Sequence, residues 1–276
     1  MAETRLNINN LKFSYTDKIT IEDINISVQR GEFIGLIGPN GCGKSTALKN
    51  VYRALTPDSG DITLDGKNLF RMRSREAALK IAVVGQENEV PFDFLVEEIV
   101  AMGRSPHKKL FEPDTAEDAR ILHHALEHLG MENMAKRNYK HLSGGEKQRV
   151  LIARAIAQES DFLILDEPAN HLDVSYQLKI FDFVKRRSAE AGVTVLSAIH
   201  DLNMAALYCD RLYVMKEGRI VLSGTPEEVL TPGNIFLIYG VPCDTAVHRI
   251  TGKVVITYIP EKIFSPTPGR GGKDSK

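Results

Sequence analysis

A nine-residue stretch has the residue types and spacing of a phosphate-binding loop. It fits the pattern G-x-x-x-x-G-K-[ST], with one additional threonine at its end. Glycines let a backbone wrap closely around an anion, the lysine can bridge the β- and γ-phosphates of a nucleotide, and the serine hydroxyl can bind Mg²⁺. The stretch therefore predicts a nucleotide site. Its residues are Gly38, Pro39, Asn40, Gly41, Cys42, Gly43, Lys44, Ser45 and Thr46.

The segments on either side of this loop suit the same chemistry. Residues 33–37 are an apolar run that predicts a buried strand, and residues 47–52 predict a helix. A loop between a strand and a helix directs backbone N–H groups and the positive end of the helix dipole at a bound phosphate. The sequence around the loop therefore supports phosphate binding.

A second glycine-containing segment could also approach a phosphate. Ser143, Gly144, Gly145 and Glu146 combine a capping box with two glycines. In such a box the serine caps the helix and the glutamate three positions later reaches back to the serine backbone. The segment predicts a helix N-terminus that starts well and that admits close approach of an anion.

Polar residues follow two further buried strands. Asp166 and Glu167 come directly after the apolar run 162–165, and His200 follows the apolar run 193–199. Continuous apolar runs of this length are typical of strands that are buried on both faces of a parallel sheet. Carboxylates at strand ends are often only helix caps, and a lone histidine is more often a core or surface group. The presence of Lys44 and Ser45 in the same chain favours a role at a nucleotide instead.

Composition and charge limit the function classes. The chain has 276 residues, a formal net charge of −1 and three widely separated cysteines. The near-neutral charge gives no field that would attract nucleic acid or an anionic membrane. Without a C-x-x-C pair, neither a zinc site nor a disulfide framework is indicated, which favours a reducing cytoplasm. No apolar run approaches the roughly 20 residues that span a bilayer.

The order of patterns along the chain predicts its organisation. Alternating apolar residues before the loop, with one slip between Ile8 and Leu11, predict two antiparallel strands on a half-buried sheet. Helical periodicity replaces strand signals over about 87–160, which indicates a helical lobe inserted into a sheet core. We expect an ATPase domain over 1–240, a C-terminal β extension over 241–264 with a hairpin, and a disordered tail over 265–276.

Taken together, residues 5 to 230 resemble the ATP-binding cassette family. The order of the phosphate loop, Gln86, the LSGGE segment 142–146, the carboxylate pair and His200 carries the resemblance. It implies an α/β fold with a mixed-sheet core around the phosphate loop, an antiparallel β subdomain and an inserted helical subdomain. It also implies ATP hydrolysis that requires Mg²⁺.

The resemblance assigns a role to each of these residues. It implies that Asp166 holds Mg²⁺ through the hydration shell of the ion, and that Glu167 is the general base for the attacking water. Gln86 would sense the γ-phosphate and the metal, and His200 would contact the γ-phosphate.

One aromatic assignment is less specific than these. Tyr15 resembles the residue that stacks on adenine, and Phe13 nearby is an alternative.

The resemblance further implies two copies arranged head to tail. Each ATP would lie between the phosphate loop of one copy and Ser143 to Glu146 of the other, with Asp173 crossing the interface. Each copy would dock at the cytoplasmic face of the membrane, in a groove between the sheet and helical lobes, onto a separate permease supplied by a substrate-binding protein. Phe92, Phe94 and Leu95 are candidates to line that groove, and lobe core is their alternative.

Within the family, residues 102–107, with Phe111 and Asp118, are similar to the ATPases of metal-chelate importers, whose substrates are iron–siderophore complexes, haem or cobalamin. The alternatives are an ATPase of another importer or a cassette protein that acts on DNA or ribosomes. Sustained heptads are absent between the nucleotide motifs and LSGGE occurs once, which disfavours the second alternative.

Overall fold

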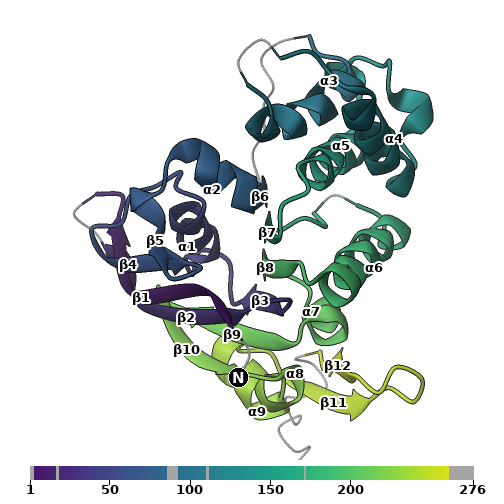
Figure 1. Cartoon of the computed structure of the whole chain (residues 1–276). Coiled ribbons are helices and arrows are strands. Elements are labelled where there is room, and N and C mark those ends of the chain that lie inside the picture. Colours follow the sequence, from purple (N-terminus) through teal and green to yellow (C-terminus); the bar gives the residue numbers. More distant parts are fainter. Residues whose placement is uncertain (1–2, 17–18, 86–92, 110–111, 171, 261–276) are drawn as a thin grey trace, which may run out of the picture.

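The computed structural model describes residues 3–16, 19–85, 93–109, 112–170 and 172–260. Within these ranges, a central sheet is covered by helices, a second sheet lies against it at one side, and a helical part lies at the far end of the molecule (Figure 1). Among the helices of these ranges, none has the length and apolarity to cross a membrane. Gln86, Phe92, Phe111 and the expected tail lie outside the described residues.

The central sheet has the strand order β10-β9-β3-β8-β7-β6, in which all neighbours are parallel except β9 and β10. Alternate residues of β3 contribute to two separate hydrophobic clusters, Phe33 and Ile37 to one and Ile34 and Leu36 to the other. Apolar side chains on both faces are what a parallel sheet between layers requires. The strands are β3 (Phe33–Ile37), β6 (Ile81–Val84), β7 (Phe162–Asp166), β8 (Thr194–Ala198), β9 (Arg211–Lys216) and β10 (Arg219–Gly224).

The second sheet is antiparallel and has the order β2-β1-β4-β5. The slip expected between Ile8 and Leu11 is confirmed as a register shift at which Asn10 takes a left-handed φ of 47°. The apolar face of this sheet packs into the same cluster as helix α1 (Lys44–Val51). Its strands are β1 (Thr4–Ser14), β2 (Ile19–Gln29), β4 (Ser59–Leu64) and β5 (Lys67–Asn68).

Between β6 and β7, the described residues form helices and turns, as the periodicity predicted. Thr115 caps one of these helices with its side chain, and Ser143 caps another in the expected capping box. The elements are α3 (Val96–Ala101), η2 (Met102–His107), α4 (Ala116–His128), η3 (Glu132–Met134), η4 (Tyr139–His141) and α5 (Gly144–Ala157).

The remaining helices cover the central sheet and lead to the C-terminal hairpin. The expected hairpin forms between β11 (Cys243–Val247) and β12 (Val254–Tyr258), and Asn203 fastens it to α7 by bonding both backbone polar groups of Ile256. The helices are η1 (Leu69–Arg71), α2 (Ser74–Lys80), α6 (Val174–Ala191), α7 (Leu202–Tyr208), α8 (Pro226–Val229) and α9 (Pro232–Tyr239).

Candidate active site

The phosphate-binding loop connects β3 to α1, and its backbone accepts only glycine at key positions. Gly38 has φ of 149°, and a Cβ there would lie 2.1 Å from the carbonyl oxygen of Met215. Gly43 has φ of 105°, and its Cβ would lie 2.6 Å from the Ile21 side chain. The glycines therefore let the loop pass close to neighbouring strands while its N–H groups open toward one cavity.

Lys44 and Ser45 are held by the loop and by the neighbouring strand. The Lys44 ammonium donates to the carbonyl oxygens of Gly38 and Pro39, at 2.9 and 3.1 Å, and the side chain is buried. The Ser45 hydroxyl donates to Oδ1 of Asp166 at 2.8 Å. These contacts bring the end of β7 against the start of α1, which joins two motifs that are far apart in the sequence.

Asp166 is a fully buried carboxylate with one oxygen left over. Its Oδ2 atom has no hydrogen-bond partner among the described residues, and its exposed fraction is 0%. Burial raises the pKa of Asp166, the adjacent Glu167 adds to the rise, and the Ser45 bond together with Lys49 and Lys44 opposes it. Burying a charged oxygen without a partner is costly, so a hydrated cation beside Ser45 fits these residues.

Glu167 is held in an unusual backbone conformation. Its φ is 52°, in the left-handed region that non-glycine residues seldom occupy, and its N–H donates to the Ala198 carbonyl oxygen. Its Oε2 atom accepts a hydrogen bond from the Asn170 side chain. A strained backbone conformation persists only where surrounding contacts stabilise it, and such conformations often occur at functional sites. Here it turns the carboxylate toward the loop cavity.

A cavity of about 610 Å³ gathers the expected nucleotide residues. Lys44 and Ser45 at the start of α1 line it together with Glu167, which follows β7, and His200, which follows β8. A volume of this size is within the usual range for small-molecule sites. Thr20, Asn40, Gly41, Gly43, Thr46 and Asn170 complete the lining.

Two of the residues that meet in this site were not assigned to it from the sequence. Asn170 lies three residues after Glu167, and this spacing is the signal that could have found it. Thr20 carries no comparable signal.

Cys42 of the phosphate-binding loop does not line the cavity. The side chain of Cys42 is buried, and burial raises the pKa of its thiol while the Lys44 charge opposes the rise. Tyr239 of α9 lies beside the same loop. Burial raises the pKa of its hydroxyl, the nearby Cys42 adds to the rise, and a hydrogen bond with the Gly38 backbone opposes it. The C-terminal helix therefore supports the loop from behind.

The aromatic candidates differ in exposure. The Tyr15 side chain is 55% exposed and Phe13 is 8% exposed, with the two rings edge to face at 4.9 Å between centroids. Only Tyr15 presents a surface on which a base could stack. It does not line the cavity, so its role stays a prediction.

The glycine-containing segment at the start of α5 lies apart from the cavity. Ser143, Gly144, Gly145 and Glu146 do not line it, and in Figure 1 α5 belongs to the helical part at the far end of the molecule. Ser143 accepts from the Glu146 N–H, and Glu146 accepts from the Ser143 N–H at 2.7 Å. The helix start is formed in the single chain, with Ser143 and Gly144 exposed and Gly145 half-buried.

Residues 102–107 also have a structural explanation. Arg104 is buried and bonds Asp118 at 3.0 Å, Glu159 at 2.9 Å and the Ala157 carbonyl oxygen at 2.9 Å. A Cβ on Gly103 would lie 2.3 Å from the Arg154 carbonyl oxygen. The segment therefore fastens η2 to α4 and α5.

Comparison with known proteins agrees with this geometry. The family model described as "ABC transporter" matches residues 21–170, more than half of the chain. The chain belongs to the ABC transporter family. The resemblance stated from the motifs, and the fold class stated with it, are thus confirmed.

The similar proteins narrow the comparison. The iron(3+)-hydroxamate import ATP-binding protein FhuC of Bacillus subtilis is 39% identical over 254 residues, which cover 92% of this chain and 94% of that protein. The ferric enterobactin transport ATP-binding protein FepC of Escherichia coli is 37% identical, with coverage of 87% and 88%.

Solved structures agree as well. A chain from an inward-facing "metal-chelate type ABC transporter" has a TM-score of 0.79 at 27% identity, covering 95% of this chain and 99% of that one. A bacterial ABC transporter cassette solved as a dimer has a TM-score of 0.70 at 28% identity, covering 80% of this chain and 98% of that one.

Proposed function

We propose that this ABC protein is the ATP-hydrolysing subunit of an importer for a metal chelate, with an iron(III)–siderophore complex as the preferred substrate class and haem or cobalamin as alternatives. The names of FhuC and FepC, each covered over most of its length, support import of iron complexes. The observation that carries the ATPase role is the single cavity lined by Lys44, Ser45, Glu167 and His200.

In this mechanism the residues of the chain divide the work on ATP. Lys44 exchanges its loop carbonyl partners for the β- and γ-phosphates, and the N–H groups of the loop and of α1 hold the remaining phosphate charge. Ser45 and Asp166 would hold Mg²⁺ between them, and the unpartnered Oδ2 atom of Asp166 supports this assignment. The ion would neutralise charge on the phosphates.

Glu167 activates the attacking water. Its carboxylate accepts the proton of that water as general base, and the Asn170 bond keeps the carboxylate in one orientation. His200 lines the same cavity and would contact the γ-phosphate. Gln86, expected to sense the γ-phosphate and the metal, lies outside the described residues.

A second copy of the chain would complete each site. Ser143 and Gly144 are exposed at a helix start that lies away from the cavity, which would let this helix start meet the γ-phosphate held by another copy. A cassette of similar fold was solved as a dimer. ATP would then favour the closed dimer, and hydrolysis would let the two copies separate. The cycle would be driven by the higher affinity of ATP for the closed dimer than for the open one.

The permease would dock in a groove beside the helical part. A cavity of about 500 Å³ between α2, η2 and α5 is lined by Ala78, Met102, Pro106 and Arg154, among others. Met102 is exposed, as an apolar contact for a partner would be. Phe94 does not line this groove and packs against the core, and Phe92 lies outside the described residues. This arrangement would place the chain at the cytoplasmic face of the membrane.

Reconstitution with the permease tests this function. The chain, its permease and its substrate-binding protein are placed in vesicles, and uptake of ferric hydroxamate, ferric catecholate, haem and cobalamin is measured with and without ATP. We expect ATP-dependent uptake of one iron chelate, with uptake lost in the Glu167→Gln variant. Uptake of none of the four, with ATPase activity intact, would refute the import of a metal chelate and leave the ATPase assignment standing.

A further inference from the structure

A cavity on the other side of α5 takes no part in the mechanism above. Its volume is about 300 Å³, at the lower end of the range for small-molecule sites. Ile152 and Ile156 of α5 face this cavity, together with Glu159 just after the helix. Arg154 of α5 and the residue that caps the C-terminus of α5, Gln158, instead line the groove proposed for the permease. The cavity is thus separate from both the nucleotide site and that groove.

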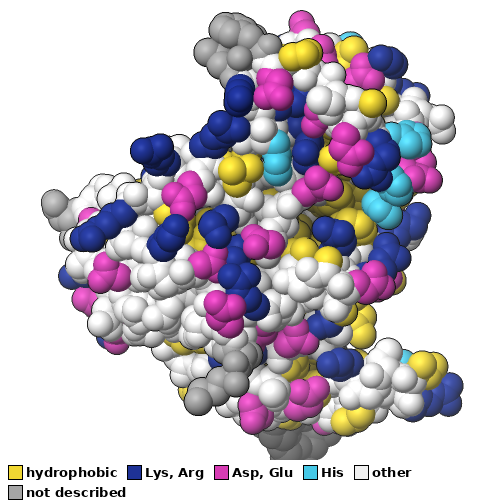
Figure 2. All heavy atoms as spheres, viewed as in Figure 1, with side chains coloured by type: hydrophobic (Ala, Val, Ile, Leu, Met, Phe, Trp, Pro, Cys, Tyr) yellow, Lys and Arg dark blue, Asp and Glu magenta, His cyan; other side chains and the backbone are white. Residues whose placement is uncertain are grey.

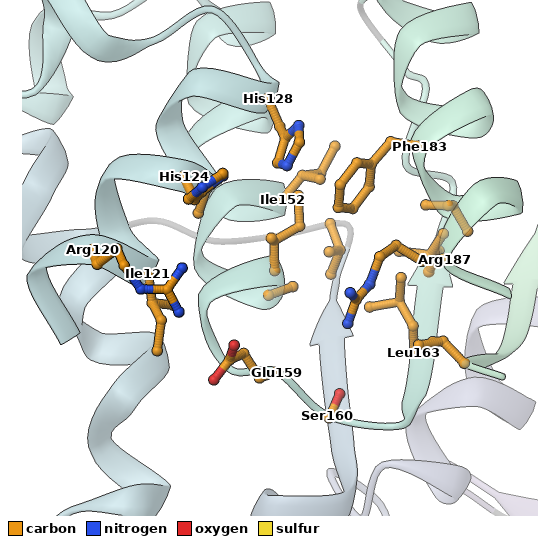
Figure 3. A pocket seen from close by; sticks show the side chains of 17 residues that line it. Arg120, Ile121, His124, His128, Ile152, Glu159, Ser160, Leu163, Phe183 and Arg187 are labelled. Carbon is orange, nitrogen blue, oxygen red and sulfur yellow. The ribbon is translucent and has the colours of Figure 1, made fainter. Parts of the chain in front are cut away.

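The floor of the cavity is apolar. Ile121 of α4, Ile152 of α5, Leu163 of β7 and Phe183 of α6 lie around it, so that the helical part and the sheet core both contribute (Figure 3). An apolar floor of this kind gains free energy by removing hydrocarbon from water. The occupant should therefore have an apolar body that is small enough for the cavity.

The rim of the cavity carries positive charge. Arg120 of α4 and Arg187 of α6 lie on opposite sides of it, and His124 and His128 lie above it (Figure 3). Figure 2 shows histidine and basic side chains gathered over α4 and α6 beside a hollow with hydrophobic atoms. Burial lowers the pKa of His128, and the charges of His124, Arg186 and Arg187 add to the fall.

The acidic side chains near the rim already have basic side chains beside them. Glu159 bonds Arg104, and Glu117 pairs with Arg120. Glu127 lies 3.9 Å from His124. The guanidinium of Arg187 is exposed, and within the described residues it makes neither a hydrogen bond nor an ion pair. An anionic group at this rim would therefore gain a charge-assisted bond without first breaking one.

We propose that this cavity binds a small amphipathic carboxylate, with its hydrocarbon against Ile152, Leu163 and Phe183 and its carboxylate on Arg187. The volume is too small for a helix or an extended peptide, and the charge of Arg187, with Glu159 already paired to Arg104, favours an anion over a cation. Because the lining comes from α4, α5, α6, β6 and β7, the bound molecule would connect the helical part to the strand that ends at Asp166.

Titration calorimetry with octanoate tests the proposal, and octylammonium is the matched cation of the same chain length. We expect saturable one-to-one binding of octanoate and much weaker binding of octylammonium. In the Arg187→Gln variant, the affinity for octanoate should fall about fivefold, which is the upper range for an ion pair at an exposed arginine. Arg249→Gln removes an exposed arginine far from the cavity and should leave the affinity unchanged.

A charge reversal supplies a second, independent readout. Arg187→Glu should abolish octanoate binding and strengthen binding of octylammonium, while circular dichroism and ATP binding stay as in the parent chain. Equal affinity of the parent chain for the two probes would overturn the proposal. So would octanoate affinities in Arg187→Gln and Arg249→Gln that match each other.

Discussion

The Asn170→Ala variant tests how the proposed general base is held. The Asn170 side chain donates to Oε2 of Glu167, whose backbone is already in a strained conformation. A hydrogen bond to a charged group contributes about 1.5–3 kcal/mol, and partial exposure of Asn170 places this one near the lower end. A loss of about 1.5 kcal/mol in the transition state corresponds to roughly a tenfold fall in kcat.

The assay is steady-state ATP hydrolysis by the assembled transporter, with kcat and KM measured separately. We expect kcat to fall about tenfold and KM for ATP to stay unchanged, because Asn170 orients the base and does not bind phosphate. Gln177→Ala is the matched control, since Gln177 bonds the Ala169 and Leu172 carbonyl oxygens of the same loop without touching Glu167. Equal losses in the two variants, or an unchanged kcat in Asn170→Ala, would refute this role.

Three further predictions concern buried groups. Asp166→Asn should abolish ATP hydrolysis and raise the stability of the nucleotide-free chain at pH 7, because the raised pKa of Asp166 means that its charged form is costly to bury. This gain in stability should shrink as the pH falls toward 4, where Asp166 of the parent chain takes up a proton. Thermal unfolding of both chains across this pH range measures the gain. Arg104→Met should lower the free energy of unfolding by about 2 kcal/mol, which is less than for an isolated buried ion pair because Asp118 keeps its contacts with Lys108 and Thr115. Urea unfolding measures this loss, with Arg73→Met as the control. Equal free energies of unfolding in the two variants would refute a stabilising role for Arg104. Cys42 should react with N-ethylmaleimide far more slowly than glutathione at pH 8, because it is buried and its pKa is raised; fast labelling of Cys42 in the folded chain, seen by mass spectrometry, would contradict this.

The sequence predicts the parts of the fold whose causes are local. The apolar runs before Gly38 and Asp166 form strands with apolar neighbours on both faces. The uninterrupted apolar composition of each run is enough to predict this. The capping box at Ser143 is local in the same sense. Even the slip between Ile8 and Leu11 left a mark in the alternation, which the structure explains by a register shift.

Contacts between distant segments were not predictable in this way. Arg104 was noted for its resemblance to a subgroup of the family, and the buried ion pair with Asp118 required the packing of η2 against α4. Tyr239 supports the phosphate loop from α9, nearly 200 residues later in the chain, and no spacing rule connects the two. The cavity behind α5 likewise arises from five elements, namely α4, α5, α6, β6 and β7, that only the tertiary fold brings together.

The claim that most of this account depends on is that each ATP is bound between two copies of the chain. Sedimentation of the Glu167→Gln variant, in which bound ATP should persist, measures this directly. We add Gly144→Asp to that variant, because a Cβ at Gly144 meets no atom within 4 Å and the folded single chain should tolerate it. Gly233→Asp, at another open position in α9, is the matched control.

The account predicts that Glu167→Gln sediments as a dimer with ATP and as a monomer without it. Adding Gly144→Asp should abolish the dimer and leave ATP binding intact, because its carboxylate would face the γ-phosphate held by the other copy, whereas adding Gly233→Asp should leave the dimer unchanged. A chain that remains monomeric with ATP bound, and a Gly144→Asp variant of the parent that hydrolyses ATP at the full rate, would contradict the account.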